Sequence, residues 1–426
     1  MRFTSLPAWL DWQAGLSPKA IDLGLDRVAE VWARLGAPSL DAAVITIAGT
    51  NGKGSSVAFA EAILTAAGYR CGCYTSPHLL HYNERIRIDG RCAADEAISA
   101  AFARIDDARR DITLTYFEFG TLAALLLFAD AGLDAVILEV GLGGRLDAVN
   151  LIDADVGVIT GIALDHQDWL GEDREAIGYE KAGIMRRGRP VVFSGREMPD
   201  SVRAHARSIG ALLQVAGEDF HIERHAGQWD LLHAARVRRA LPLPGLRGAV
   251  QIENAAGVLV ALDCLAGRLP IDQAAVRQGL LNARVAGRFE VRPGQPTWVL
   301  DVAHNPQAAQ TLAANLGDLF VSGQTVAVCG MLADKDAAAV AATLAARFDR
   351  WYLVDLSDDP RGLRADALAK RVASVVDRER LVVCGKPRQA LAEVAARCGG
   401  DDVVVVFGSF LTVSAAMAWL EQPSPN

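Results

Sequence analysis

Residues 44–64 read VITIAGTNGKGSSVAFAEAIL, an apolar run followed by a glycine-rich loop and an alanine-rich stretch. This order predicts a strand, a tight loop at 49–55 and then a helix. Glycines let the backbone wrap around an anion with its N–H groups pointing inward, and the helix N-terminus adds favourable partial charge. The stretch therefore predicts a phosphate-binding loop, in which Lys53 reaches the β- and γ-phosphates and Ser55 meets phosphate or Mg²⁺.

The spacing of this loop departs from the common motif G-x-x-x-x-G-K-[ST], because residue 54 is glycine and the hydroxyl comes one residue later. A glycine-rich turn that binds nothing is the competing interpretation, but turn chemistry alone explains a lysine among three glycines poorly. Residues 141–146, GLGGRL, begin like the dinucleotide motif G-x-G-x-x-G but end in leucine and open no obvious helix. They are weak support for a nicotinamide cofactor.

Short β-branched runs alternate with longer Ala- and Leu-rich stretches along the chain, which indicates parallel strands covered by helices on both faces of a sheet. The alternation is interrupted by LPLPGLRG at 241–248 and by a Gly-, Arg- and Pro-rich stretch at 282–296. A second strand–helix series begins there. We therefore expect an α/β fold with two domains. A P-loop-type, mostly parallel sheet domain (1–288) would bind ATP, and a smaller Rossmann-like α/β domain (289–426) would follow. The expected strands are 44–48, 70–74, 135–140, 156–160, 190–193, 298–301, 325–329, 351–354, 381–383 and 403–407.

Composition limits the classes of function. The chain has 426 residues, of which 51% are hydrophobic, enough for two to three domains with full cores. A formal net charge of −8 disfavours a nucleic-acid partner, because Lys and Arg must neutralise phosphates. No apolar run reaches the ~18 residues that cross a bilayer, and the N-terminus lacks the pattern of a signal peptide. The seven cysteines form no CxxC pair, which favours buried free thiols in a reducing compartment. We expect a cytoplasmic monomer with small-molecule partners.

Several polar residues follow predicted strands, at the edge where open α/β sheets place their ligands. Ser76 and Glu139 offer oxygen atoms that suit Mg²⁺. An unpaired carboxylate in an apolar strand is costly, so Glu139 favours a functional role. His166 alone is more often a hydrogen-bonding loop residue, since imidazole prefers softer metals. Lys181, on a predicted helix after the 165–166 loop, is by default a solvated lysine.

Nine stretches of this sequence together carry a resemblance to a known family. In chain order they are AGTNGKGSS (48–56), TSPHLLHYNERIRIDG (75–90), TYFEFGTLAA (115–124), LEVGLGGRLDAVN (138–150), DHQDWLG (165–171), EKAGI (180–184), QIENAAG (251–257), GRFE (287–290) and LDVAHNP (300–306). They resemble the folate branch of the Mur ligase superfamily, the bifunctional dihydrofolate synthase/folylpolyglutamate synthases. Any one stretch would be modest support, whereas nine in order are specific.

The resemblance implies a role for individual residues. It places the ATP phosphate loop at Gly52, Lys53, Gly54 and Ser55, and further nucleotide contacts at Asn254, Arg288, Asp301 and His304. It places metal ligands at Ser76, Glu139 and His166, with Lys181 carried as a carbamate that supplies an anionic oxygen near the metal. Lys53, His166 and Lys181 are thereby the implied catalytic residues. It assigns dihydropteroate binding to Ile21, Asp22, Leu23, Thr115, Tyr116, Phe117, Glu118, Asp147, Ala148 and Val149. Residues that bind glutamate are not assigned.

The implied activity is an ATP- and Mg²⁺-dependent ligation. The carboxylate of dihydropteroate or tetrahydrofolate would attack the γ-phosphate, giving an acyl phosphate and ADP, and the amine of L-glutamate would then displace phosphate. A Mur-type ligase acting on a UDP-linked cell-wall precursor is the nearest alternative, and the TYFEFG segment argues against it. An alternative of another class is a P-loop nucleotide switch, whose ATP turnover would need neither a carboxylate nor an amino acid.

Overall fold

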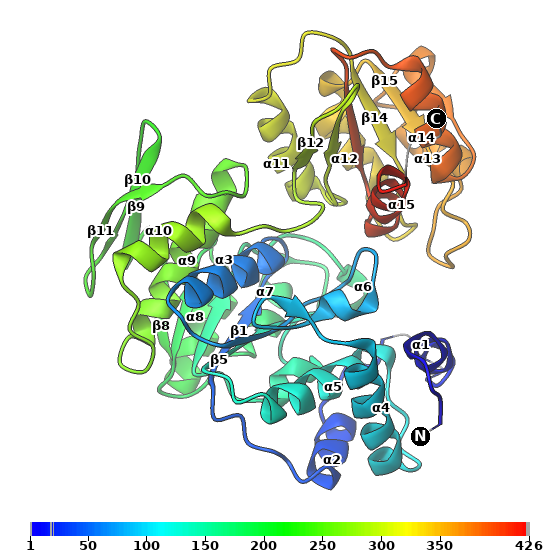
Figure 1. Cartoon of the computed structure of the whole chain (residues 1–426). Coiled ribbons are helices and arrows are strands. Elements are labelled where there is room, and N and C mark those ends of the chain that lie inside the picture. The colour runs from blue at the N-terminus through cyan, green and yellow to red at the C-terminus, as the bar shows by residue number, and fades with distance from the viewer. Residues whose placement is uncertain (1, 18, 20, 423–426) are drawn as a thin grey trace. The chain divides into compact units, whose positions relative to one another are not determined.

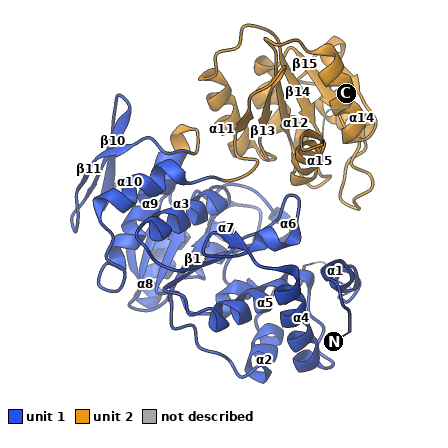
Figure 2. Ribbon diagram, viewed as in Figure 1, with its two compact units in different colours: residues 1–245, 251–284 blue, residues 246–250, 285–426 orange. Residues whose placement is uncertain are grey.

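The computed structural model describes residues 2–17, 19 and 21–422, and the chain divides into two compact units (Figure 2). Unit 1 comprises residues 1–245 and 251–284, and unit 2 comprises residues 246–250 and 285–426. The main change of unit, between residues 284 and 285, lies close to the boundary expected at residue 288.

Unit 1 is built on an eight-stranded sheet with the order β4-β3-β2-β5-β1-β6-β7-β8. The six strands from β2 to β8 in this order run parallel, and only the pairings of β3 with β2 and with β4, at one edge, are antiparallel. The mostly parallel sheet predicted from the sequence is confirmed. Its strands are β1 (Ala43–Ala48), β2 (Cys71–Tyr74), β3 (Ile86–Ile88), β4 (Arg91–Cys92), β5 (Ala135–Glu139), β6 (Val156–Ile159), β7 (Pro190–Phe193) and β8 (Leu212–Val215).

The centre of this sheet determines where a ligand can bind. Every residue of β1 and β5 is buried, as expected for strands covered on both faces. β1 pairs with β5 on one side and β6 on the other. The chain therefore leaves β1 at a point where neighbouring connections diverge, which is where open α/β sheets bind ligands.

Ten helices belong mainly to unit 1 in the described part of the chain: α1 (Leu6–Ala14), α2 (Asp26–Arg34), α3 (Lys53–Ala66), α4 (Asp95–Arg109), α5 (Tyr116–Asp130), α6 (Gln167–Leu170), α7 (Arg174–Ala182), α8 (Asp200–Ile209), α9 (Ala249–Cys264) and α10 (Gln273–Asn282). α3 packs on the sheet and α10 packs along α3 (Figure 1). The approach is close, since a Cβ on Gly279 would lie 2.5 Å from the Cα of Ile63. α5 begins with a capping box, in which Thr115 and Glu118 satisfy each other's backbone N–H groups.

A small antiparallel sheet in unit 1 was not anticipated from the sequence. It consists of β9 (Phe220–His225), β10 (Gln228–His233) and β11 (Arg238–Pro242), in the order β11-β10-β9. The loop predicted at 241–248 is wrong at its start, because β11 extends to Pro242. An edge strand can accept proline there, since it has one side without a pairing partner.

Unit 2 has a six-stranded sheet with the order β12-β13-β17-β14-β15-β16, parallel except for β12. Val403–Phe407 is buried throughout and forms a central strand, as its uninterrupted apolar sequence predicts. The strands are β12 (Glu290–Arg292), β13 (Thr297–Leu300), β14 (Thr325–Cys329), β15 (Arg350–Leu353), β16 (Leu381–Val383) and β17 (Val403–Phe407). The helices are α11 (Pro306–Gly317), α12 (Ala337–Leu344), α13 (Ala365–Val372), α14 (Pro387–Arg397) and α15 (Phe410–Leu420). The second α/β domain predicted from the sequence is confirmed.

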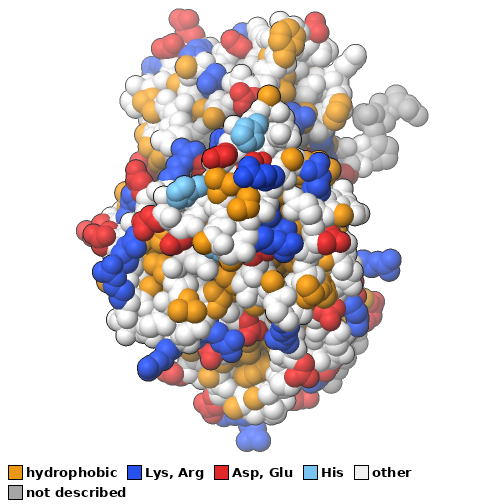
Figure 3. Space-filling view, turned by 90° about the vertical axis from the view of Figure 1, so that its left-hand side faces the viewer, with side chains coloured by type: hydrophobic (Ala, Val, Ile, Leu, Met, Phe, Trp, Pro, Cys, Tyr) orange, Lys and Arg blue, Asp and Glu red, His pale blue; other side chains and the backbone are white. Residues whose placement is uncertain are grey.

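The surface carries charges of both signs. On the face drawn in Figure 3, basic and acidic side chains are interspersed among hydrophobic ones, without a continuous basic area. The prediction that the cysteines are buried is only partly correct: Cys71, Cys73 and Cys329 are buried, but Cys92 is exposed on the short strand β4. Among the described residues, no helix combines the length and apolar character that a membrane span requires.

Candidate active site

The phosphate loop connects β1 to α3 and is held from the side by the end of β6. Gly52, the N-cap of α3, has a φ of +91°, a left-handed conformation that glycine adopts without strain. Thr160 Oγ1 donates to the carbonyl oxygen of Asn51 at 2.6 Å. Thr50 Oγ1 donates to the carbonyl oxygen of Ala163 at 3.1 Å and accepts from the N–H of the same residue. These bonds fix the loop against the segment that leads to His166.

Two lysines meet at this loop. Lys53 Nζ donates to the carbonyl oxygen of Gly49 at 3.0 Å, and Lys181 Nζ, from α7, donates to the same oxygen at 3.0 Å. Lys181 is only 4% exposed, so its default interpretation as a solvated lysine is wrong. Burial, together with the nearby positive charge of Lys53, lowers the pKa of Lys181 to about 7.

The carboxylate predicted as a metal ligand lies over the same loop. Glu139, at the end of β5, is 5% exposed. A Cβ on Gly54 would lie 3.8 Å from Glu139 Oε2, so the glycine leaves room beside the carboxylate. The backbone N–H of Ser76 donates to Glu139 Oε2 at 3.3 Å, which brings the two predicted ligands together. His166 is the N-cap of α6, in the segment held by Thr50.

Asn254 reaches the loop from α9. A Cβ on Gly52 would come within 2.6 Å of Asn254 Oδ1, so this side chain lies directly against the start of α3. Asn254 is 5% exposed, and its Nδ2 donates to Gln251 Oε1 at 3.1 Å. Of the four predicted nucleotide contacts outside the loop, Asn254 is the one that lies in unit 1.

The three segments predicted to bind dihydropteroate are joined in pairs. Arg27 pairs with Asp22 at 2.9 Å and with Glu118 at 2.9 Å, linking the first segment to the second. The N–H of Gly24 donates to the carbonyl oxygen of Leu146 at 3.2 Å, linking the first segment to the neighbourhood of the third.

The third segment contains a buried carboxylate. Asp147 accepts hydrogen bonds from the N–H groups of Leu142 at 2.8 Å and Val149 at 3.0 Å. Burial raises the pKa of Asp147 to about 6, although these hydrogen bonds act in the opposite direction. Val149 and Ala148 belong to the 3-10 turn that this carboxylate caps. The ring of Phe117 lies over Gly141, where a Cβ would come within 2.6 Å of its Cζ.

The remaining predicted nucleotide contacts form a cluster within unit 2. The guanidinium carbon of Arg288 lies 5.7 Å from the ring centroid of Phe410, and the ring of His304 lies 6.2 Å from the same ring. Asp301 accepts hydrogen bonds from the N–H groups of Phe289 at 2.9 Å and Ala303 at 2.8 Å. Burial raises the pKa of Asp301, and the positive charge of Arg288 opposes this shift. The carboxylate of Asp301 is therefore held by the backbone of residues 289 and 303.

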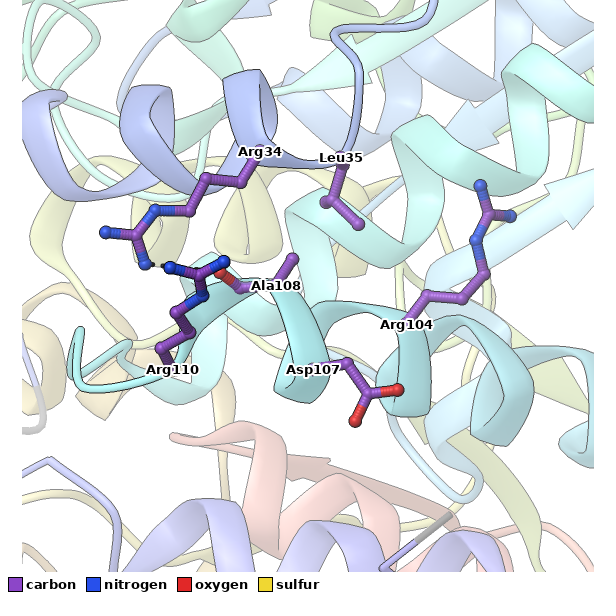
Figure 4. A pocket seen from close by; sticks show the side chains of 6 residues that line it. All are labelled: Arg34, Leu35, Arg104, Asp107, Ala108 and Arg110. Carbon is purple, nitrogen blue, oxygen red and sulfur yellow. Dashed lines mark hydrogen bonds between the residues drawn. The ribbon is translucent and has the colours of Figure 1, made fainter.

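A surface hollow of about 450 Å³ lies elsewhere in unit 1, between α2 and α4. Its lining residues are Arg34, Leu35, Arg104, Asp107, Ala108 and Arg110, none of which was predicted for the site. In Figure 4 the side chains of Arg34 and Arg110 point toward one another. Arg34 donates to the carbonyl oxygens of Ala108 and Arg109, the last residues of α4. Arg34 therefore caps the C-terminus of α4, where positive charge is favourable.

Sequence reasoning missed two residues that organise this site. Thr160 follows an apolar strand, and the strand-end rule used for Ser76 and Glu139 could have found it. Arg27 carries no comparable signal, because its importance comes from two partners that are distant along the chain.

Comparisons with known proteins match two family domains to this chain. Residues 47–207 match the Mur ligase middle domain, and residues 287–410 match the Mur ligase glutamate ligase domain. The chain is 45% identical over 416 residues to the dihydrofolate synthase/folylpolyglutamate synthase of Escherichia coli, covering 97% of this chain and 94% of that protein.

Two solved structures are similar over the whole chain. One is E. coli FolC in complex with DHPP and ADP, with a TM-score of 0.92, 44% identity and 98% of each chain covered. The other is a bifunctional folylpolyglutamate synthase/dihydrofolate synthase with Mn, AMPPNP and L-glutamate bound, with a TM-score of 0.90, 44% identity and 98% of each chain covered.

Proposed function

This chain belongs to the dihydrofolate synthase/folylpolyglutamate synthases of the Mur ligase family, and from that premise we propose which of its residues carry the reaction. The chain is an ATP-dependent ligase that adds L-glutamate to dihydropteroate, giving dihydrofolate, and to tetrahydrofolate, giving folylpolyglutamate. One observation carries the assignment of residues: Lys53 and Lys181 donate to one carbonyl oxygen of the phosphate loop, beside the carboxylate of Glu139.

Phosphate binding falls to the loop and to α3. Gly52 and Gly54 let the backbone approach the phosphates, and the N-terminus of α3 with Ser55 supplies donors. Lys53 supplies a positive charge where negative charge develops on the transferring phosphoryl group. Asn254, packed against Gly52, sets the width of this end of the site.

The residues beside the loop fit a divalent cation. Glu139 is buried next to a glycine that leaves space, and carboxylate and hydroxyl oxygens are the ligands that Mg²⁺ prefers. Glu139, Ser76, His166 and Lys181 as a carbamate would hold the ion. When bound, Mg²⁺ would neutralise phosphate oxygens and orient them. The N–H of Ser76 donates to the carboxylate of Glu139 and orients it independently of the ion.

The reaction proceeds in two steps. An oxygen of the acceptor carboxylate attacks the γ-phosphorus, the bond to the β-phosphate oxygen breaks, and ADP leaves. The amine of glutamate then attacks the acyl carbon, loses a proton and expels phosphate. The first step needs alignment and charge neutralisation more than covalent help from the protein, and the loop with Lys53 supplies both.

The segments proposed to bind the acceptor flank the phosphate loop and the Glu139 strand in the sequence. Phe117 offers an aromatic face over Gly141, and Asp147 offers a buried carboxyl group for polar atoms of the pterin. Ile21, Asp22 and Leu23 border this pocket with Thr115, Tyr116, Glu118, Ala148 and Val149. The contacts that Arg27 makes with Asp22 and Glu118 support this grouping.

The nucleotide contacts proposed within unit 2 are Arg288, Asp301 and His304. Arg288 and His304 both lie against Phe410, and Asp301 and His304 both bond to the backbone of residues 302–303. These shared contacts support a single patch. The enzyme acts as a monomer in the cytoplasm. Its seven cysteines are all free, which suits a reducing compartment.

The experiment is a coupled assay of ADP release with each acceptor, with and without L-glutamate, followed by mass spectrometry of the product. Sustained ADP release should require acceptor and glutamate together, and the product should gain one glutamyl group. ATP turnover without a carboxylate would identify a nucleotide switch instead. Turnover only with a UDP-linked precursor would identify another Mur-type ligase.

A further inference from the structure

Arg85 is a buried arginine without a carboxylate partner. Three arginines of the described chain are buried: Arg85 (9% exposed), Arg109 (7%) and Arg238 (1%). Arg109 pairs with Asp106 at 2.8 Å, and Arg238 pairs with Asp263 at 2.5 Å. Arg85, by contrast, forms no ion pair with any Asp or Glu that the structure describes, and its Nε donates to His78 Nδ1 at 2.8 Å. Because a buried charge is costly unless it is paired, this guanidinium lacks the anion that the other two have.

The neighbouring carboxylate cannot supply that anion. Glu84 is adjacent in sequence, but its two oxygens accept hydrogen bonds from the backbone N–H groups of Leu79, Leu80 and His81 at 2.7–2.8 Å. These bonds hold the 79–84 turn, so Glu84 has a structural task of its own.

The other groups around Arg85 are aromatic rings and hydroxyls. Its guanidinium carbon lies 5.4 Å from the ring centroid of Tyr82 and 5.5 Å from that of Tyr116, which stabilises the cation without neutralising it. The hydroxyl of Tyr82 is buried and has no hydrogen-bond partner among the described residues. It lies with the hydroxyl of Tyr74 over Gly120, at 2.6 and 2.8 Å from the position a Cβ would take. Arg85 and Tyr82 thus belong to one aromatic cluster, in which no Asp or Glu of the described chain pairs with the guanidinium.

This region adjoins the proposed acceptor pocket. The carbonyl oxygen of Arg85 accepts from the N–H of Thr75, next to Ser76. Tyr116, which stacks on the guanidinium, precedes the aromatic platform Phe117. His78, Tyr116 and Phe117 are partly exposed, so the residues that surround the guanidinium extend to the surface of unit 1.

We propose that Arg85 binds the unreactive carboxylate of a glutamylated acceptor. This group is the α-carboxylate of the acceptor's terminal glutamate. The proposal rests on the function proposed above. Dihydropteroate has one carboxylate, which is the reacting one, and Lys53 with the metal ligands serves it. Tetrahydrofolate has a second carboxylate, and Arg85 is a second cation in the same unit. A planar guanidinium binds a carboxylate through two parallel hydrogen bonds, so Arg85 favours the glutamylated acceptor.

The test compares kcat/KM for tetrahydrofolate and for dihydropteroate in wild-type enzyme and in Arg85→Gln. In Arg85→Gln, kcat/KM for tetrahydrofolate divided by kcat/KM for dihydropteroate should fall roughly 10- to 100-fold, as expected for a lost charge-assisted hydrogen bond. Most of this fall should come from a higher KM for tetrahydrofolate. Arg85→Lys should recover part of the loss. Arg109→Gln is the matched control: it should lower the melting temperature without changing the ratio. An unchanged ratio in a folded Arg85→Gln variant overturns the proposal.

A second measurement changes the acceptor instead of the enzyme. The acceptor is a tetrahydrofolate analogue with its α-carboxylate converted to a carboxamide. In the wild-type enzyme, the KM for this analogue should exceed the KM for tetrahydrofolate by a similar factor. In Arg85→Gln, the analogue and tetrahydrofolate should have nearly the same KM. The carboxamide and the substitution remove the same contact, so their effects on KM are not additive. Normal use of the analogue by wild-type enzyme overturns the proposal. A wild-type enzyme without glutamate-dependent turnover on either acceptor would instead overturn the proposed function, so the two failures are distinguishable.

Discussion

The ammonium nitrogens of Lys53 and Lys181 each lie 3.0 Å from one atom, the carbonyl oxygen of Gly49. Two like charges on one acceptor repel each other, and the burial of Lys181 adds the cost of desolvation. The arrangement is relieved if anionic phosphate binds beside Lys53 or if Lys181 loses its positive charge.

Carbamylation of Lys181 removes that charge, and we expect it in the resting enzyme. The neutral amine attacks CO₂, a proton leaves, and a carbamate with two anionic-type oxygens results. The pKa of Lys181, lowered to about 7 by burial and by Lys53, makes the neutral amine available above pH 7. Protein equilibrated with ¹³C-bicarbonate at pH 8 should show a carbamate resonance that weakens below about pH 7. The control is Lys181→Arg, which should lack this carbamate resonance. A wild-type spectrum identical to that of Lys181→Arg would contradict the assignment.

The same lysine predicts how stability depends on pH when CO₂ is excluded. The folded pKa of about 7 lies below the ordinary value of 10.5, so the folded state binds fewer protons than the unfolded state between them. The free energy of unfolding should therefore increase between pH 7 and pH 10, relative to a Lys181→Met variant whose other titrating groups are the same. Urea unfolding of both proteins measures the difference. Parallel pH profiles would show that the ammonium is solvated.

Lys53→Ala should reduce ligation with both acceptors together. The loss should be on the order of 10²- to 10³-fold in kcat, because a donor to the developing charge is removed. The melting temperature should change little, since the lost hydrogen bonds to the Gly49 and Thr50 carbonyl oxygens are offset by the removal of repulsion with Lys181. Lys370→Ala, which removes an exposed lysine, is the control. Near-normal turnover in folded Lys53→Ala would exclude the assigned phosphate role.

Gly52→Ala should weaken nucleotide binding, and Gly68→Ala is its matched control. Both glycines have left-handed backbones, with φ of +91° and +87°, so alanine costs about 1–2 kcal/mol at either position. Only at Gly52 would the new Cβ also come within 2.6 Å of a side chain, that of Asn254, whereas nothing lies within 4 Å at Gly68. Calorimetric titration with a non-hydrolysable ATP analogue should show at least a roughly tenfold weaker Kd for Gly52→Ala alone. Equal affinities in the two variants would remove Gly52 from the nucleotide site.

Phe117→Ala should impair dihydropteroate use more than tetrahydrofolate use. The aromatic face over Gly141 is lost, and the shorter acceptor has fewer other contacts to compensate. We expect a fall of roughly tenfold in kcat/KM for dihydropteroate, measured by paired kinetics with both acceptors. Phe320→Ala removes a phenylalanine that is 90% exposed and should change neither. If the wild-type enzyme extends tetrahydrofolate but not dihydropteroate, the bifunctional assignment fails.

Much of the fold could be predicted because its signals are local. The apolar runs that form β1, β7 and β17 are continuous, since strands covered on both faces have no polar side. The phosphate loop could be predicted from Gly49–Ser55 alone, because glycine positions and a helix start determine its conformation. The sheet β9–β11 could not, because its strands alternate weakly and lie partly at the surface.

The two α/β units, the phosphate loop and the identity of the groups at strand ends could be predicted from local sequence, because each depends on residues that are close along the chain. Which of these groups meet depends on tertiary packing. Lys181 reaches Gly49 from a helix 132 positions away in sequence, and Asn254 covers Gly52 from α9. Arg85 has the same sequence character as any arginine, and its lack of a carboxylate partner follows from what packs around it. Such contacts depend on strand order and helix packing, which bring together side chains that no local pattern connects.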